Sequence, residues 1–263
     1  MNQRVAKPVE ITGDDVSPAE QALRYELTTL AFRLPDAAVA KTAIDPWLTS
    51  PDARGRLLGK WEAEHGILGR LYVLREFEDD AELAAERMRA AHSSRPFGAG
   101  NHLTDLTMHG FAPFPFMPRV ATGEFGSVYE IRDYHLIPGG LPATIEGWRI
   151  KLPGRHVVDP IAIVMYALDG PARIVHIWPF SGLDDRVAVR QRLVDAGKWP
   201  PPAGPTLRVG YGASASAAAC ATALSWSPVP PLTPTAPTIW PPCCSGIPPA
   251  KIMMRPRLDT CIP

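Results

Sequence analysis

The amino-acid sequence predicts an α+β protein made of two ferredoxin-like copies of one βαββαβ unit. Motifs recur about a hundred residues apart, which indicates a duplicated domain because there are two long copies rather than many short ones. Residues 25–27 (Tyr-Glu-Leu) return as residues 129–131 (Tyr-Glu-Ile), and residues 69–77 align with residues 172–180. Within each copy, segments with strand composition alternate with segments whose apolar residues recur at helical spacing.

The second copy opens with a predicted strand over residues 128–136, which is rich in β-forming residues. A turn at residues 138–140 leads into a predicted helix. We expect Pro153 and Gly154 to kink or end this helix, because proline followed by glycine interrupts a helix. The apolar stripe of this helix has helical spacing and comprises Leu141, Ile145, Trp148 and Leu152.

Two further strands and a second helix complete the pattern. Residues 161–168 form a short apolar run, and residues 173–180 follow after a turn; both are predicted strands. Residues 183–196 are predicted to be the second helix. In the first copy, residues 102–110 supply a fourth strand, but the proline-rich sequence after Trp199 has no obvious counterpart. We therefore expect the last strand of the second copy to be missing.

The chain divides by composition into four parts. We expect a flexible N-terminus (1–19), a first repeat (20–118), a second repeat (125–202) and a proline-rich, low-complexity tail (203–263). All four cysteines lie in this tail, and its one acidic residue is Asp259. Two interpretations of the tail stay open: a disordered segment, and a translated frameshift that has replaced the missing strand.

Bulk properties narrow the classes of function. The chain has 263 residues and zero formal net charge, so we expect no nucleic-acid partner. We also expect no membrane span and a cytoplasmic protein, because the sequence contains neither a long apolar run nor a secretory signal. No phosphate-loop or dinucleotide-binding motif is present, and the histidines, such as His102 and His109, lack metal-site spacing. We therefore expect no cofactor and no metal.

Several segments resemble the NIPSNAP family. They are the strand and turn at residues 128–140, the block at residues 174–186 with the Trp-Pro-Pro at 199–201, and the aromatic-proline run at residues 109–116. The resemblance implies two NIPSNAP-like repeats of the dimeric α/β-barrel type, in which two sheets face each other across a cavity. It also implies either a barrel closed within one chain or a homodimer. The family has no agreed reaction, and its animal members are linked to mitochondria and to vesicle or mitophagy signalling.

Strand alternation selects candidate site residues in the second copy. Glu130, Arg132 and Tyr134 share one face of their strand, and His176 and Trp178 share one face of theirs. We expect the aliphatic faces to pack on the helices, so that these five side chains point into the cavity and bind a small planar or acidic ligand. His176 is the candidate general acid or base.

The first copy provides an internal comparison. The counterparts of Arg132 and His176 are Thr28 and Val73, so the fold does not require the polar residues. A structural role stays open, with Glu130 and Arg132 as a strand ion pair and His176 as an interior histidine. We therefore expect a small-molecule-binding protein, with or without catalysis; the alternative is a protein-binding scaffold or signalling module without catalysis.

Overall fold

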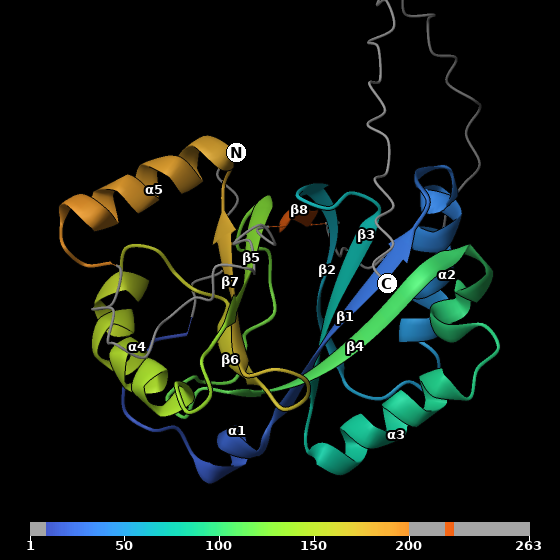
Figure 1. Cartoon of the computed structure of the whole chain (residues 1–263), viewed down its shortest axis with the longest axis horizontal. Helices are drawn as coiled ribbons and strands as arrows, with labels where there is room; N and C mark the ends of the chain where they lie inside the picture. The colour runs from blue at the N-terminus through green and yellow to red at the C-terminus, as the bar shows by residue number, and fades with distance from the viewer. Residues whose placement is uncertain (1–8, 200–218, 224–263) are drawn as a thin grey trace, which may run out of the picture. The chain divides into compact units, whose positions relative to one another are not determined.

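The computed structural model describes residues 9–199 and, for the backbone alone, residues 219–223 (Figure 1). The chain divides into two units, Met1–Ser225 and Trp226–Pro263, and every described residue belongs to the first. Most of the proline-rich tail, and the N-terminal residues 1–8, lie outside the described residues. The predictions of flexibility, disorder or frameshift for these segments therefore stay predictions.

The first copy contains four strands and two long helices, preceded by a short helix α1 (Pro18–Ala22). Three 3-10 turns connect its elements, at Leu34–Asp36, Pro96–Gly98 and Gly100–His102. The elements run in the order β1 (Arg24–Phe32), α2 (Ala37–Leu48), β2 (Arg56–His65), β3 (Arg70–Phe77), α3 (Asp80–Ala91) and β4 (Leu103–Pro113).

The second copy repeats this order. Its elements are β5 (Val128–His135), α4 (Leu141–His156), β6 (Ile163–Ala167), β7 (Arg173–Phe180), α5 (Leu183–Asp195) and β8 (Ala219–Ala223). Of the two expectations at Pro153, a kink or an end of the helix, the end is wrong, because α4 continues to His156. The buried side chains of Arg155 and His156 tie this last turn to neighbouring segments, which offsets the hydrogen bond that proline cannot donate.

The eight described strands form one closed antiparallel barrel in the order β1-β3-β2-β8-β5-β7-β6-β4. Each copy contributes four neighbouring strands with the ferredoxin-like arrangement, β4-β1-β3-β2 and β8-β5-β7-β6. The predicted fold class is confirmed, and one chain closes the barrel without a second copy.

The predicted loss of the last strand is wrong. Ala219–Ala223 occupies the position of the fourth strand in the second copy and pairs with both β5 and β2. Without it, these two strands would present unpaired backbone donors and acceptors. The strand was not recognised because it is short and consists of alanine, cysteine and threonine within a proline-rich region.

Three hydrophobic clusters hold this unit together. One fills the barrel interior with side chains of both copies, including Tyr25, Trp61, Tyr129, Ile131 and Ile177. The second lies between the second-copy strands and helices α4 and α5, and the third lies between the first-copy strands and α2 and α3. Figure 1 shows the two pairs of helices on opposite sides of the barrel. None of the described helices combines the length and apolar character needed to cross a membrane.

Candidate functional site

Strand pairing brings the five predicted site residues together. In the antiparallel pair β5–β7, Glu130 lies opposite Trp178 and Arg132 lies opposite His176. Tyr134 follows on the same face of β5 and contacts the ring of His176, with the ring centroids 4.9 Å apart. We call this set, with the charged side chains from α4 and α5 that contact it, the polar layer of the second copy.

The polar layer faces the helices, which corrects the predicted orientation. The aliphatic face, with Ile131, Val175 and Ile177, lies inside the barrel, where it packs against side chains of the first copy. The interior of a closed barrel touches strands alone, so apolar side chains fill it, whereas polar side chains find partners on the helices outside. The predicted cavity between the two sheets is therefore occupied by side chains.

Glu130 is the centre of the charged part of this layer. Its carboxylate, 1% exposed, lies 2.7 Å from Nη2 of Arg132, accepts hydrogen bonds from Arg186 (Nε at 2.8 Å), and lies 3.6 Å from Nη1 of Arg190. Arg186 and Arg190 both come from α5. Burial alone would raise the pKa of Glu130, but Arg186 and Arg132 hold this pKa below its usual value. The carboxylate is therefore ionised in the folded protein.

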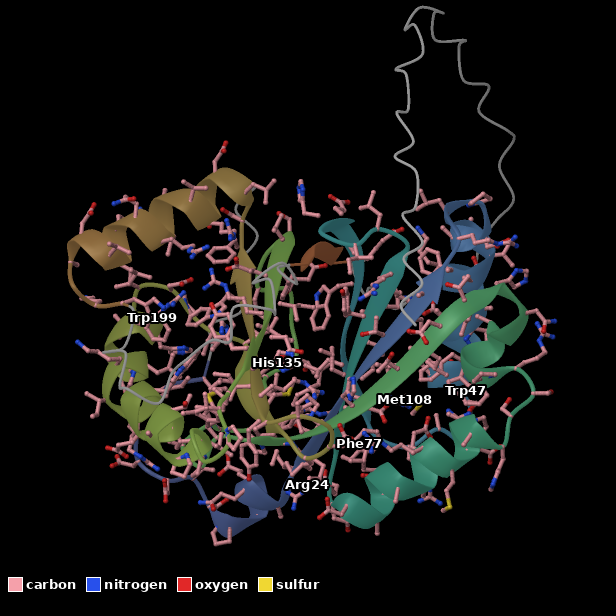
Figure 2. All side chains as sticks on the ribbon, in the orientation of Figure 1. Arg24, Trp47, Phe77, Met108, His135 and Trp199 are labelled. Carbon is pink, nitrogen blue, oxygen red and sulfur yellow. The ribbon has the colours of Figure 1, made fainter. Side chains whose placement is uncertain are left out.

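The layer contains a second ion pair, which lies beside Trp178. Arg155 and Asp159 are both almost fully buried and are joined by a 2.6 Å hydrogen bond. The guanidinium of Arg155 stacks on two indoles, 3.5 Å from the ring centre of Trp178 and 4.3 Å from that of Trp199. Burial lowers the pKa of Arg155 to about 10, which leaves the side chain charged at neutral pH. Trp199 lies on the α4 side of the barrel, across from Trp47 (Figure 2).

His176 is the fully buried histidine of the layer. Its Nδ1 accepts a hydrogen bond from Nε1 of Trp178 at 2.6 Å, and its ring contacts Tyr134 and Trp148. Its Nε2 has no hydrogen-bond partner among the described residues. Burial, together with the positive charges of Arg132 and Arg155, lowers the pKa of His176 well below 6.5. The imidazole is therefore neutral.

The first copy has a polar layer at the same positions, and its charges are balanced. Glu26, opposite Arg75 in the β1–β3 register, accepts hydrogen bonds from Arg75 at 2.6 Å and from Arg87 at 3.1 Å. The network continues through Glu86, which pairs with Arg75 and with Arg89, and through Asp169, 2.9 Å from Arg87. Three arginines thus contact three carboxylates, two of them from the first copy and one, Asp169, from the loop between β6 and β7 of the second copy.

The helical members of the second-copy layer were not predicted from the sequence. Arg155, Asp159, Arg186 and Arg190 lie on α4, beyond it and on α5, away from the strands whose alternation identified the other residues. Comparison of the two copies could have identified Arg190 as a member of the layer. Arg87 and Arg190 both stand seven residues after the first residue of their helices, α3 and α5, and each contacts the equivalent glutamate of its copy.

Two surface depressions lie away from this layer. An open groove in the first copy, between the 51–56 loop and α3, carries charges of both signs, including Arg54, Glu78 and Glu82. A smaller, mostly apolar pocket lies beside His156, whose two ring nitrogens are engaged by Val9 O at 2.8 Å and Ile161 N at 3.2 Å. Among the described residues, no group of three or more histidine, cysteine, aspartate or glutamate side chains has the arrangement of a metal site.

Comparisons with known proteins agree with this architecture. Residues 129–228 match the model of the NIPSNAP family. A Dictyostelium discoideum protein described as "Protein NipSnap homolog" is 25% identical over 145 residues, which are 54% of this chain and 65% of that protein. The matched region thus spans just under two thirds of that relative.

A solved structure with a TM-score of 0.50 shows the same fold. An anthrone oxidase-like protein superposes with a TM-score of 0.50 at 10% identity, covering 68% of this chain and 86% of that one. An uncharacterised NIPSNAP-like domain protein from Burkholderia xenovorans is 18% identical, with a TM-score of 0.30, and covers 39% of this chain and 94% of that one. The fold is that of the dimeric α/β-barrel proteins, and residues 129–228, less than half of this chain, are similar to the NIPSNAP family.

Proposed function

We propose that this protein binds a small molecule in the polar layer of its second copy, between strands β5 and β7 and helices α4 and α5. The observation that carries the proposal is the buried Nε2 of His176, which has no hydrogen-bond partner among the described residues. A buried polar atom without a partner is costly and uncommon in native proteins. A ligand atom that pairs with Nε2 would remove this cost.

The first copy argues against a purely architectural role for these residues. Val73 occupies the position of His176, opposite Thr28, and the same βαββαβ unit folds around it. The second copy therefore carries an imidazole, with its desolvation cost, where an aliphatic side chain satisfies the fold. Selection for a binding role explains why this cost persists.

The exposure of the arginines suggests how a ligand reaches the layer. The side chains of Arg190, Arg186 and Arg132 are 44%, 23% and 9% exposed, which defines a gradient from solvent to the buried His176. A ligand that meets Arg190 first can move inward along side chains that donate hydrogen bonds. The aromatic rings of Tyr134 and Trp148, whose centroids each lie 4.9 Å from that of His176, suit a planar ligand.

A thermal-shift screen of the full chain tests this proposal. The panel contains small acids, quinones and haem, and the variant is His176→Val, which installs the first-copy residue. A bound ligand stabilises the folded state by about 2.7 kcal/mol at a hundred times its Kd, so the melting temperature rises with ligand concentration. We expect at least one compound to shift the wild type and to lose its effect on His176→Val. The proposal is wrong if no compound shifts the wild type, or if every shift survives in the variant.

A different observation favours the alternative, a protein-binding module. The outer face of α5 exposes three large apolar side chains, Leu183, Val187 and Val194, with exposed fractions of 42%, 62% and 55%. Val187→Asp therefore serves as the second variant in the screen. We expect it to keep the ligand-induced shift, because Val187 lies on the surface away from the polar layer.

A further inference from the structure

We infer that the ligand of the second-copy polar layer carries an oxyanion, a carboxylate or phosphate group, whose oxygens accept hydrogen bonds from Nε2 of His176 and from Arg132 and Arg190. This inference rests on the proposed function and adds the chemical class of the ligand. Two independent observations support it: the hydrogen bond from Trp178 to Nδ1 of His176, and the surplus of positive charge around Glu130.

The proton of His176 is placed by its contact with Trp178. An indole Nε1 is a donor and never an acceptor, so the 2.6 Å contact requires a lone pair on Nδ1 of His176. A neutral imidazole with a lone pair on Nδ1 carries its proton on Nε2. Burial keeps the pKa of His176 far below neutrality, so the doubly protonated form is excluded. The unpartnered atom is therefore an N–H donor, which needs an acceptor.

The arginines around Glu130 also lack enough negatively charged partners. Arg132, Arg186 and Arg190 share this one carboxylate, whereas Arg155 is balanced by Asp159. Burial and repulsion by Arg132 lower the pKa of Arg190, because the attraction of Glu130 does not fully offset them. The layer thus holds two more positive than negative charges, in contrast to the balanced layer of the first copy.

The sequence after Trp199 offers little to neutralise this surplus. After Trp199 the chain contains one acidic residue, Asp259, among its last 64 positions. Among the buried atoms of the layer without a hydrogen-bond partner in the described residues, Nε2 of His176 and Nη2 of Arg132 are donors and Oε2 of Glu130 is an acceptor. This Oε2 lies 2.7 Å from Nη2 of Arg132, so the atom left without any polar neighbour among the residues described is Nε2 of His176. A neutral or cationic ligand would leave these donors or charges uncompensated, whereas an oxyanion satisfies both at once.

Arg132 and His176 define where the oxyanion lies. They stand opposite each other on neighbouring strands, so their Cβ atoms are about 5 Å apart and their side chains leave the same face. Arg190 lies at the solvent side of the same group, with the exposure that an incoming ligand requires. The remainder of the ligand then lies toward Tyr134, which accepts a hydrogen bond from Nη1 of Arg132 at 3.1 Å and donates to no carboxylate of the described residues.

A matched set of probes tests the charge requirement on the full chain. Benzoate, benzamide and benzylamine share a planar ring and differ in charge, and inorganic phosphate tests an oxyanion without a ring. Calorimetric titrations run at constant ionic strength, so that general salt effects cancel. We expect benzoate or phosphate to bind, and benzamide and benzylamine to bind at least about tenfold more weakly, as expected for loss of a charge-assisted hydrogen bond. Phosphate binding alone would identify phosphate as the recognised group.

The two proposals fail in different ways. If benzamide or benzylamine binds as tightly as benzoate, and the binding is lost in His176→Val, the oxyanion inference is wrong while a ligand in the layer stands. If no probe and no compound of the wider panel binds, both are wrong.

Substitutions of the arginines and of Glu130 test the inference with whichever oxyanion binds, benzoate or phosphate. Arg190→Gln removes a half-exposed donor, and we expect benzoate or phosphate to bind about tenfold more weakly. Glu130→Gln removes the internal carboxylate that competes for the same arginines, so we expect tighter oxyanion binding. Arg192→Gln, exposed on the same helix, removes the same charge outside the layer and should change neither affinity. Equal effects of Arg190→Gln and Arg192→Gln would overturn the inference, even if Glu130→Gln fails to fold.

Discussion

The indole N–H of Trp178 donates to Nδ1 of His176 at 2.6 Å, and the two residues lie two positions apart on one face of strand β7. Both side chains are fully buried, so the hydrogen bond is shielded from water. It fixes the orientation and the tautomer of the imidazole, and it directs the Nε2–H group into a layer of arginines and aromatic rings. The properties proposed for the second copy depend on this contact.

Trp178→Phe should destabilise the protein by about 1–3 kcal/mol, because it removes the donor and leaves Nδ1 of the buried His176 without a partner. Urea unfolding followed by circular dichroism measures the change. Trp47→Phe is the matched control, because Nε1 of Trp47 already lacks a hydrogen-bond partner among the described residues. If Trp47→Phe costs as much as Trp178→Phe, the hydrogen bond to His176 contributes nothing beyond ring packing.

The neutral state of His176 makes stability depend on pH. Its pKa is well below 6.5 in the folded protein and returns toward 6.5 on unfolding, so below pH 6.5 the unfolded state binds more protons. The free energy of unfolding therefore falls as the pH drops below 6.5 and is unaffected by this group above it. The buried His156, whose pKa is also lowered, adds to the same trend.

Replacing His176 by valine should reduce this decline between pH 6.5 and pH 5, as measured by urea unfolding at each pH. His92→Val, at an exposed position on the end of α3, is the control and should leave the profile unchanged. A profile for His176→Val that runs parallel to that of the wild type would contradict a buried, neutral His176.

Loss of the buried Glu26 from the first-copy layer should lower stability more than loss of an exposed glutamate. Glu26→Gln leaves the buried Arg75 with one of its two carboxylates, and we expect a loss of about 3 kcal/mol. Glu78→Gln, at a side chain that is 66% exposed, removes a surface ion pair with Arg119 and should cost less than about 1 kcal/mol. Equal losses would show that the Glu26 network is not desolvated as described.

Closure of the barrel by β8 predicts a backbone effect at Ala221. This residue pairs with Ala63 of β2 and with Tyr129 of β5, so proline at this position removes a donor from a central strand. We expect Ala221→Pro to lower stability by about 3 kcal/mol and Ala221→Ser, which keeps the N–H, to have little effect. An unchanged melting temperature for Ala221→Pro would place residues 219–223 outside the barrel.

Much of the fold was predictable because the two copies share their pattern. The internal alignment that pairs His176 with Val73 and Arg132 with Thr28 reappears as the register of β7–β5 and β3–β1. Strand alternation also grouped Glu130, Arg132 and Tyr134 correctly on one face. These features are local, so the sequence contains the information that determines them.

The direction of that face could not be predicted from alternation. Ile131 and Ile177 suit a helix-packing surface and a barrel interior equally well, and the choice depends on whether the sheet closes. Closure in turn depends on β8, a five-residue strand without large β-forming side chains. The helical partners Arg186 and Arg190 depend on how α5 packs on the sheet, which is a tertiary property.

Binding of an oxyanion at Nε2 of His176 is tested most directly by nitrogen-15 NMR of histidine-labelled full-length protein. The free protein should show His176 with its proton on Nε2 and a lone pair on Nδ1. Addition of benzoate or phosphate should shift the Nε2 and Nε2–H resonances in the wild type, and these resonances should be absent in His176→Val. The account is contradicted if His176 carries its proton on Nδ1, or if an oxyanion that binds the protein leaves the His176 resonances unchanged.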